Sequence, residues 1–228
     1  MDFDPAGQAL LCCLARGVRE FVVCAGARNA PLVRALAGVD GVTVWSHFEE
    51  RGAGFFALGR IVDRGLPVAV VTTSGTAAAE LLPAVVEAHY QQRPLIALTA
   101  DRPERFRGSG APQAIEQAGL FGVHVEGADD LAADRAGQPF EGWSGLGPWH
   151  LNVCLEEEVP VPEVTVPHEP PEAAGRPRPA VAELVPFLQE DSFRGLVAMV
   201  GGLDPEERED AFHFLRELDV PVGAGATS

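Results

Sequence analysis

The sequence has few basic residues and no long apolar run. Lys and Arg together number 17 against 33 Asp and Glu, so the 228-residue chain carries a formal net charge of −16 at pH 7. Binding to a nucleic-acid backbone needs a basic surface, and this balance argues against a nucleic-acid partner. Small anionic ligands stay possible, because a few arginines can create a locally positive site. No stretch is apolar for long enough to cross a bilayer, and Met1–Asp4 is acidic where a secretory signal would be basic, so we expect a cytoplasmic protein with no membrane partner.

The cysteines and histidines lack the spacings of metal and disulfide motifs. The four cysteines are Cys12, Cys13, Cys24 and Cys154. They form no Cys-x-x-Cys pair and no disulfide framework, which predicts buried, reduced thiols. The six histidines are scattered along the chain, without the short spacings that metal ligation on one element requires. We therefore expect no protein-bound structural metal in this chain.

Short apolar runs alternate with helix-like segments over the first hundred residues. The helix-like segments span 9–15, 31–37, 50–62 and 77–91, and the strand-like runs span 20–24, 42–45, 67–71 and 94–99. This alternation is typical of βαβ crossovers and predicts an α/β fold with three layers around a mainly parallel sheet. Beyond it, residues 121–125 suggest another strand, 129–136 a short acidic helix, and 149–155 a strand that would complete the sheet.

Proline divides the chain into predicted domains. Residues 158–180 are too proline-rich for a helix or a central strand and predict a linker between a first domain at 1–157 and a second at 181–228. In the second domain we expect a helix at 182–188, a strand at 195–200, a capped helix at 204–218 and a strand opening at 220. A unit of this size buries too little surface to be complete, so we expect only the start of a central α/β domain.

Four loops directly follow the predicted strands and therefore share the carboxyl edge of the sheet, where open parallel sheets bind ligands. They contain residues 25–31, 47–52, 72–77 and 98–103. In the second loop, Glu49 and Glu50 follow an apolar run at the head of a helix, where a carboxylate can lose water and take part in proton transfer. The third loop offers hydroxyls and backbone amides at a helix N-terminus, which is typical of a site for an anion or a polar ring.

Motifs of two common site classes are missing from these loops. No Gly-x-Gly-x-x-Gly follows the first strand, and the third loop lacks the lysine of a P-loop, which argues against nucleotide binding. No Gly-x-Ser-x-Gly surrounds Ser74, which argues against a serine hydrolase.

The four loops in this order, followed by Gly110–Ile115, resemble the N-terminal half of the 2-succinyl-5-enolpyruvyl-6-hydroxy-3-cyclohexene-1-carboxylate synthases. This family consists of thiamin-diphosphate enzymes of menaquinone biosynthesis. The match runs from about Gly17 to Val125, and Thr-Ala-Asp-Arg-Pro at 99–103 is its most specific marker. Residues 149–152 resemble the strand that closes the pyrimidine-binding domain of the family, and 194–228 resemble the start of its central domain.

The resemblance implies a set of site residues. Glu50, rather than Glu49, stands where the family glutamate hydrogen-bonds the aminopyrimidine ring and lets the cofactor activate itself, so it is the expected catalytic residue and a cofactor contact. Further cofactor contacts are expected from Gly26, Ser74, Gly75 and Thr76. Substrate contacts are expected from Arg28, Asn29, Arg102 and Gln113. The forked donors of arginine suit the carboxylates of the family's substrates.

The resemblance also implies a transferase activity, a cofactor and partners. The family decarboxylates 2-oxoglutarate and adds the succinyl-semialdehyde unit to isochorismate. Its cofactor is thiamin diphosphate, held by Mg²⁺ or Mn²⁺ on a third domain that this chain does not contain, so no metal ligand is expected here. A homodimer or homotetramer is implied, and the chain alone is expected to be inactive.

The chain departs from the family at two of these loops, and other functions stay open. Ala25–Asn29 replaces the usual Pro-Gly-Ser-Arg-Ser, and Pro112 replaces an Asn. The alternatives are another thiamin-diphosphate decarboxylase or synthase, and a non-catalytic α/β module that binds a carboxylate or a partner chain.

Several site residues also have a purely structural alternative. Glu50 could only complement a helix dipole, Ser74 and Thr76 could be helix caps, and Asp101 with Arg102 could form a surface ion pair.

Overall fold

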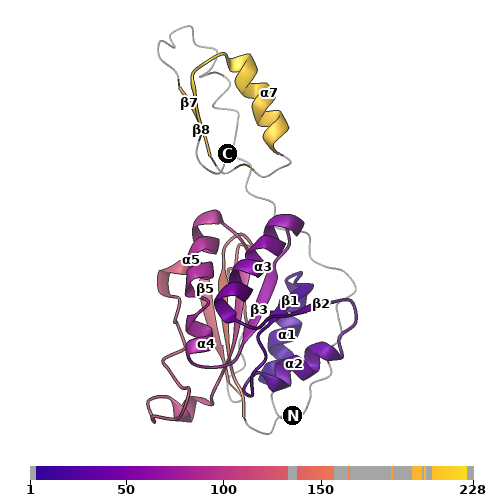
Figure 1. The fold of residues 1–228 in the computed structure, drawn as a ribbon, viewed down its shortest axis with the longest axis vertical. Helices are drawn as coiled ribbons and strands as arrows, with labels where there is room; N and C mark the ends of the chain where they lie inside the picture. The colour runs from indigo at the N-terminus through magenta and orange to yellow at the C-terminus, as the bar shows by residue number, and fades with distance from the viewer. Residues whose placement is uncertain are drawn as a thin grey trace. The chain divides into compact units, whose positions relative to one another are not determined.

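The computed structural model describes residues 4–132, 138–156 and 207–224, together with 164, 186, 197–201 and 203. They belong to two compact units, residues 1–175 and 176–228 (Figure 1). The predicted linker and the predicted helix at 182–188 lie outside the described residues, apart from the single positions 164 and 186. The predicted domain boundaries therefore stay a prediction.

A six-stranded parallel sheet forms the first unit. The strands are β1 (Glu20–Val23), β2 (Thr43–Ser46), β3 (Val68–Thr72), β4 (Leu95–Asp101), β5 (Gly127–Leu131) and β6 (Trp149–Cys154), in the order β2-β1-β3-β4-β6-β5. The central strands β3, β4 and β6 are buried along their whole length, which explains the nearly continuous apolar sequences of β3 and β4. Because β2 and β3 lie on opposite sides of β1, the strand order reverses between β1 and β3, and such a switch point is where parallel sheets bind ligands.

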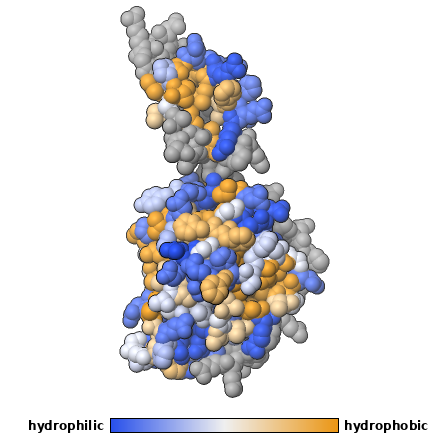
Figure 2. All heavy atoms as spheres, in the orientation of Figure 1, coloured by the Kyte–Doolittle hydropathy of each residue, from blue (hydrophilic) through white to orange (hydrophobic). Residues whose placement is uncertain are grey.

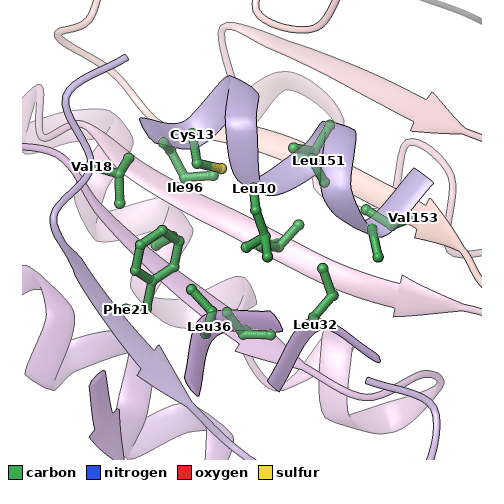
Figure 3. Close-up of a cluster of buried hydrophobic side chains, with 14 of the residues drawn as sticks. Leu10, Cys13, Val18, Phe21, Leu32, Leu36, Ile96, Leu151 and Val153 are labelled. Atoms are coloured by element: carbon green, nitrogen blue, oxygen red, sulfur yellow. The ribbon is translucent and has the colours of Figure 1, made fainter. Parts of the chain in front are cut away.

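Helices cover both faces of this sheet, as Figure 1 shows. On one face, α1 (Pro5–Ala15) and α2 (Ala30–Ala37) bury Leu10 and Leu32 in a cluster with Ile96 and Leu151 of the sheet (Figure 3). On the other face, α3 (Glu50–Arg64) and α5 (Leu82–Gln91) pack through a second apolar cluster against β1, β3 and β4. The predicted three-layer α/β fold is confirmed.

Proline and glycine set the helix ends after β2. The predicted helix at 77–91 is in fact two helices, α4 (Thr76–Ala79) and α5, because Pro83 lacks an N–H and is tolerated only in the first turn of a helix. Helix α3 ends at Gly65, which adopts a left-handed φ of 67°.

The strand predicted at 121–125 is wrong. A 3₁₀ turn at Gly122–His124 takes its place. The apolar residue that suggested a strand, Phe121, is buried edge-on against the ring of His150, with 4.7 Å between the ring centroids. Phe121 is therefore apolar because its ring packs in the core, although the residue lies next to a turn and not in a strand.

The helix predicted at 129–136 is also wrong over its described part, which is the edge strand β5. Residues 133–137 lie outside the described residues. The carboxylate of Asp129 accepts hydrogen bonds from the indole of Trp149 (2.6 Å) and from the backbone N–H of Phe140 (3.0 Å). These partners are distant in sequence, so local periodicity could not reveal the strand.

The second unit contains a two-stranded parallel sheet of β7 (Ala198–Val200) and β8 (Val222–Ala224), with α7 (Arg208–Leu218) between them in sequence. The strand-helix-strand order agrees with the sequence pattern, while the predicted cap at 204–206 lies outside the described residues. In the part of the chain that the structure describes, no helix combines the length and the apolarity needed to cross a membrane.

Candidate active site at the switch point of the sheet

Two loops meet at the switch point between β1 and β3. Residues 25–29 follow β1, and residues 73–75 follow β3. A Cβ added to Gly26 would lie 2.7 Å from the Cβ of Thr73, a distance that real side chains do not reach. Glycine at position 26 is therefore required for the close approach of the two loops.

Asn29, expected as a substrate contact, makes its hydrogen bonds within the protein, and its contact with a substrate stays a prediction. Asn29 is fully buried, and its side-chain oxygen accepts a hydrogen bond from the backbone N–H of Gly26 (2.8 Å). Its amide nitrogen donates to the carbonyl of Cys24 (2.9 Å). Both ends of the amide thus fix the shape of the loop.

A pocket of about 400 Å³ opens beside these loops, a volume typical of small-molecule sites. Five residues expected from the sequence line it: Gly26, Arg28, Ser74, Arg102 and Gln113. The loops after β1, β3 and β4 bring them together at the carboxyl edge of the sheet. Of the remaining expected residues, Glu50, Gly75 and Thr76 are not among its lining residues.

The two expected arginines of the pocket are held by backbone carbonyls. Arg28 donates from Nη1 to the carbonyl of Leu155 (3.2 Å), and Arg102 donates from Nε to the carbonyl of Pro112 (3.0 Å). The guanidinium of Arg102 also lies 5.9 Å from the ring centre of Phe106. These contacts orient both guanidinium groups, whose planar set of N–H donors is of the kind that binds anions.

The acidic residue that lines the pocket, Glu156, is paired with an arginine that does not line it, Arg105. Glu156 lines the pocket, and its two carboxylate oxygens accept hydrogen bonds from Arg105 at 2.5 and 2.7 Å. The Arg105 guanidinium holds the pKa of Glu156 below its usual value. The pocket is therefore positively charged in a chain whose net charge is −16.

The turn after β3 is clamped by the loop that follows β4. The Ser74 hydroxyl donates to the carbonyl of Gln113 (3.1 Å), and the Gln113 side chain donates back to the carbonyl of Ser74 (3.0 Å). The backbone N–H of Gly75 donates to the side chain of Gln117 (2.9 Å). These two donors, which the sequence suggested for a ligand, already have partners within the protein.

The alternative that Ser74 and Thr76 cap a helix is wrong. The N-terminal cap residue of α4 is Gly75, which has no side chain with which to cap the helix. Thr76 is exposed. Gly75 has a left-handed φ of 79°, and a Cβ there would lie 2.8 Å from the carbonyl oxygen of Gln113, so this close approach requires glycine.

The two adjacent glutamates have different surroundings. Glu49 caps α3, and its carboxylate accepts hydrogen bonds from the backbone N–H of Gly52 (2.7 Å) and of Arg51 (2.9 Å). These bonds, that of Gly52 above all, lower the pKa of Glu49. Glu50 is half-buried and makes no hydrogen bond or ion pair with the residues that the structure describes. Its carboxylate is thus available to a ligand.

Glu50 lies near the end of β1, because β2 pairs with β1 up to Ser46 opposite Val23 and α3 begins shortly afterwards, at Glu50. Burial, followed by the negative charges of Glu50 and then Glu49, raises the pKa of the Cys24 thiol to about 12. Cys24 directly follows β1, so Glu50 lies toward the carboxyl edge of the sheet, on the side of the loop that contains Gly26. This is the edge at which its motif predicts it, while its catalytic role stays a prediction.

A buried polar network lies under the clamped turn. Gln117, besides its bond to Gly75, donates to Asn152 (2.8 Å), which also accepts a hydrogen bond from the Thr99 hydroxyl (2.9 Å). Asn152 in turn donates to the carboxylate of Asp101 (3.1 Å). The network ties the marker sequence at 99–103 to the turn after β3.

Arg107 also belongs to this network. Its role was not predicted from the sequence. Arg107 makes two hydrogen bonds of 2.7 Å to the carboxylate of Asp130 and one of 3.2 Å to Asp101. The Asp130 carboxylate raises the pKa of Arg107 above its usual value. The expected surface pair of Asp101 with Arg102 is therefore wrong: Asp101 is buried and pairs with Arg107, while Arg102 lines the pocket.

The residues present suit the binding of the aminopyrimidine ring of a thiamin cofactor better than the binding of the metal ion at its diphosphate. Glu50 is half-buried and has no partner within the described ranges, and such a carboxylate suits a hydrogen bond to a ring nitrogen. Among the described residues, no group of three or more His, Cys, Asp or Glu side chains is placed to hold a metal ion.

Comparison with known proteins gives one matching family and several similar proteins. Residues 5–120 match the family described as thiamine pyrophosphate enzyme, N-terminal TPP binding domain. The chain is 53% identical over 222 residues to the 2-succinyl-5-enolpyruvyl-6-hydroxy-3-cyclohexene-1-carboxylate synthase of Akkermansia muciniphila, a match that covers 95% of this chain and 41% of the relative. It is 46% identical over 212 residues to the synthase of the same name from Bdellovibrio bacteriovorus, covering 90% of this chain and 40% of that relative.

The match to a solved structure supports the fold. The Rhodococcus jostii RHA1 thiamine diphosphate-dependent 4-hydroxybenzoylformate decarboxylase superposes with a TM-score of 0.74 at 14% identity, covering 97% of this chain and 44% of that one. The chain spans about two fifths of the length of the curated relatives above. By the family match over residues 5–120, the chain belongs to the thiamine pyrophosphate enzymes and carries their N-terminal cofactor-binding domain.

Proposed function

We propose that this chain is the N-terminal part of a 2-succinyl-5-enolpyruvyl-6-hydroxy-3-cyclohexene-1-carboxylate synthase. The whole enzyme would decarboxylate 2-oxoglutarate and add the succinyl-semialdehyde unit to isochorismate in menaquinone biosynthesis. One observation carries the proposal: among the residues that the structure describes, Glu50 has no partner, and it lies at the edge of the sheet where a positively charged pocket opens. The two relatives reported above are synthases of this name, which supports the proposal.

Glu50 is the residue that would hold the cofactor's aminopyrimidine ring. Thiamin diphosphate, when bound, supplies the electron sink that stabilises a carbanion after loss of CO₂. The contribution of Glu50 is to hydrogen-bond a ring nitrogen and to hold the proton there. Glu49 cannot take this role, because the two backbone N–H groups of the helix N-terminus occupy its carboxylate.

The arginine pocket would bind and orient the anionic substrates. Arg28 and Arg102 are oriented by carbonyl contacts, and guanidinium groups suit carboxylate oxygens. Gln113 lines the same pocket. The side chain of Gln113 donates to the carbonyl of Ser74, which fixes its direction and leaves its oxygen as an acceptor for a substrate hydroxyl.

The diphosphate and its Mg²⁺ or Mn²⁺ would be held by a further part of the enzyme, in a homodimer or homotetramer. The exposed apolar side chains near Glu50 support such an assembly. Phe48 is 100% exposed directly before the two glutamates, and Trp45 is 36% exposed on the edge strand β2. Figure 2 shows hydrophobic patches among hydrophilic ones on the face of the first unit where α3 lies. A cytoplasmic location stays a prediction.

Calorimetry tests the proposal. We expect the 228-residue chain to bind thiamin diphosphate with Mg²⁺ weakly, and to bind it at least tenfold more tightly after addition of the C-terminal diphosphate-binding domain of a full-length relative. Glu50→Gln should abolish that gain, while Glu87→Gln, an exposed position on α5, should preserve it. Tight binding by the chain alone would contradict the assignment, and binding of dicarboxylates with no gain from the added domain would instead support the non-catalytic module.

A further inference from the structure

A third arginine, Arg34, lines the same pocket and was missed by sequence reasoning. It lies in the last turn of α2, about one helical turn after Ala30 and Pro31, which also line the pocket. Its side chain is exposed and makes no hydrogen bond, ion pair or ring contact with the residues that the structure describes. Spacing along α2 was the signal that could have found it.

The three guanidinium groups of the pocket differ in how they are held. Arg28 and Arg102 each donate to a backbone carbonyl, so their positions are set by the loops around them. Arg34 has no such contact among the described residues and keeps all its donors for a ligand. Glu156, the acidic residue of the lining, pairs with Arg105, and the charge of Arg28 also acts on its carboxylate. With three arginines and one glutamate, the lining keeps an excess of positive charge.

We propose that Arg34 binds a second carboxylate of the ligand that Arg28 and Arg102 hold, and thereby makes the pocket select dicarboxylates over monocarboxylates. The inference rests on the proposed function and adds a specificity-determining residue to its substrate site. A guanidinium fork is matched by one carboxylate, so a ligand whose single carboxylate is held at Arg102 leaves the fork of Arg34 unmatched. A second carboxylate removes that mismatch.

A matched pair of ligands tests this inference. 2-Oxoglutarate and 2-oxopentanoate have the same chain length and differ in the second carboxylate. Their binding to the 228-residue chain can be followed by NMR titration at constant ionic strength. We expect Arg34→Gln to weaken 2-oxoglutarate binding about fivefold, which corresponds to about 1 kcal/mol, and to change 2-oxopentanoate binding less than about twofold. Arg34→Lys should retain most of the preference, since it keeps the charge.

Arg64→Gln is the matched control. It removes the same charge at an exposed position at the far end of α3, and it should change neither titration. Because Arg34 is exposed, Arg34→Gln should leave the thermal unfolding midpoint unchanged in circular dichroism, which separates a binding effect from misfolding.

Three outcomes would overturn the inference. If Arg34→Gln weakens the binding of both compounds equally, Arg34 acts through long-range electrostatic attraction and does not recognise the second carboxylate. No effect of Arg34→Gln, when Arg28→Gln and Arg102→Gln abolish binding, would remove Arg34 from the site and leave the proposed function standing. If the unaltered chain binds neither compound, the pocket is no carboxylate site, and the substrate assignment of the proposed function fails with the inference.

Discussion

At the scale of single residues, two neighbouring glutamates of identical chemistry take different tasks. The carboxylate of Glu49 is used by the helix N-terminus, whereas that of Glu50 has no partner among the described residues. We predict that Glu49→Ala lowers the thermal unfolding midpoint through loss of the cap, and that Glu50→Ala does not. Differential scanning calorimetry of both variants checks this, and equal midpoints would contradict the division of tasks.

Burial of His150 predicts a pH dependence of stability. Desolvation outweighs the opposing charge of Asp130 and lowers the pKa of His150 to about 4, against 6.5 for an exposed histidine. As the pH falls from 6.5 toward 4, the unfolded chain takes up a proton that the folded chain does not. The free energy of unfolding therefore falls by about 1.4 kcal/mol per pH unit in this window, with no effect above it.

Urea denaturation between pH 7 and pH 4.5 measures this slope. Carboxylates with lowered pKa, such as Glu20 and Glu156, lose their contribution only at lower pH, so the window isolates the histidine. We expect His150→Gln to flatten the slope, because glutamine does not titrate and can still hydrogen-bond the Thr99 hydroxyl, which lies 2.8 Å from Nε2 of His150. An unchanged slope in this variant would assign the effect to other groups.

The sequence located the loops of the candidate site more reliably than the ligand-facing atoms. Motif order placed Arg28, Arg102 and Gln113 together, and all three line one pocket. It assigned Asn29 and the amide of Gly75 to ligands, yet both are used by the protein itself. Side chains from distant segments of the chain decide which hydrogen-bond donors of the loops remain for a ligand. A local sequence pattern does not contain that information.

At the scale of elements, the clamp of the β4 loop on the turn after β3 decides the shape of the pocket. Gly75→Ala would force a side chain into a left-handed backbone and within 2.8 Å of the Gln113 carbonyl oxygen. We expect it to lower the free energy of unfolding by about 2 kcal/mol and to weaken anion binding. Chemical denaturation and a 2-oxoglutarate titration measure the two effects.

Gly59 provides the control for this substitution. It lies in the interior of α3 with ordinary helical geometry, and a Cβ there would meet nothing within 4 Å. Gly59→Ala should therefore stabilise the protein by about 0.5–1 kcal/mol through a better helix propensity. Equal effects of the two alanines would contradict the importance of the clamp.

Elements were predictable where one physical signal dominates. Strands β3 and β4 are buried on both faces, so their apolar runs stand out in the sequence. Strand β5 contains Asp129 and Asp130, whose partners Trp149, Asn152 and Arg107 are supplied by distant segments. Its strand character follows from tertiary contacts, and the acidic composition suggested a helix instead.

At the scale of the whole molecule, the apolar surface near the two glutamates predicts an interface. Phe48 is 100% exposed, so Phe48→Ser should leave the thermal unfolding midpoint unchanged. The same variant should weaken the gain in thiamin diphosphate affinity from the added C-terminal domain by about tenfold, if that domain covers the side chain. Calorimetry with both proteins measures this, and an undiminished gain would place the interface elsewhere.

The amide of Asn29 and the side chains of Gln113 and Gln117 hold the two switch-point loops from within the protein. The crevice therefore has its shape before any ligand arrives. Ordering a flexible backbone costs about 1–2 kcal/mol per residue in conformational entropy, and a ligand entering this crevice is spared that cost for residues 25–29 and 73–75. Even a few modest contacts can then hold a small anion, and binding should proceed without a slow ordering phase.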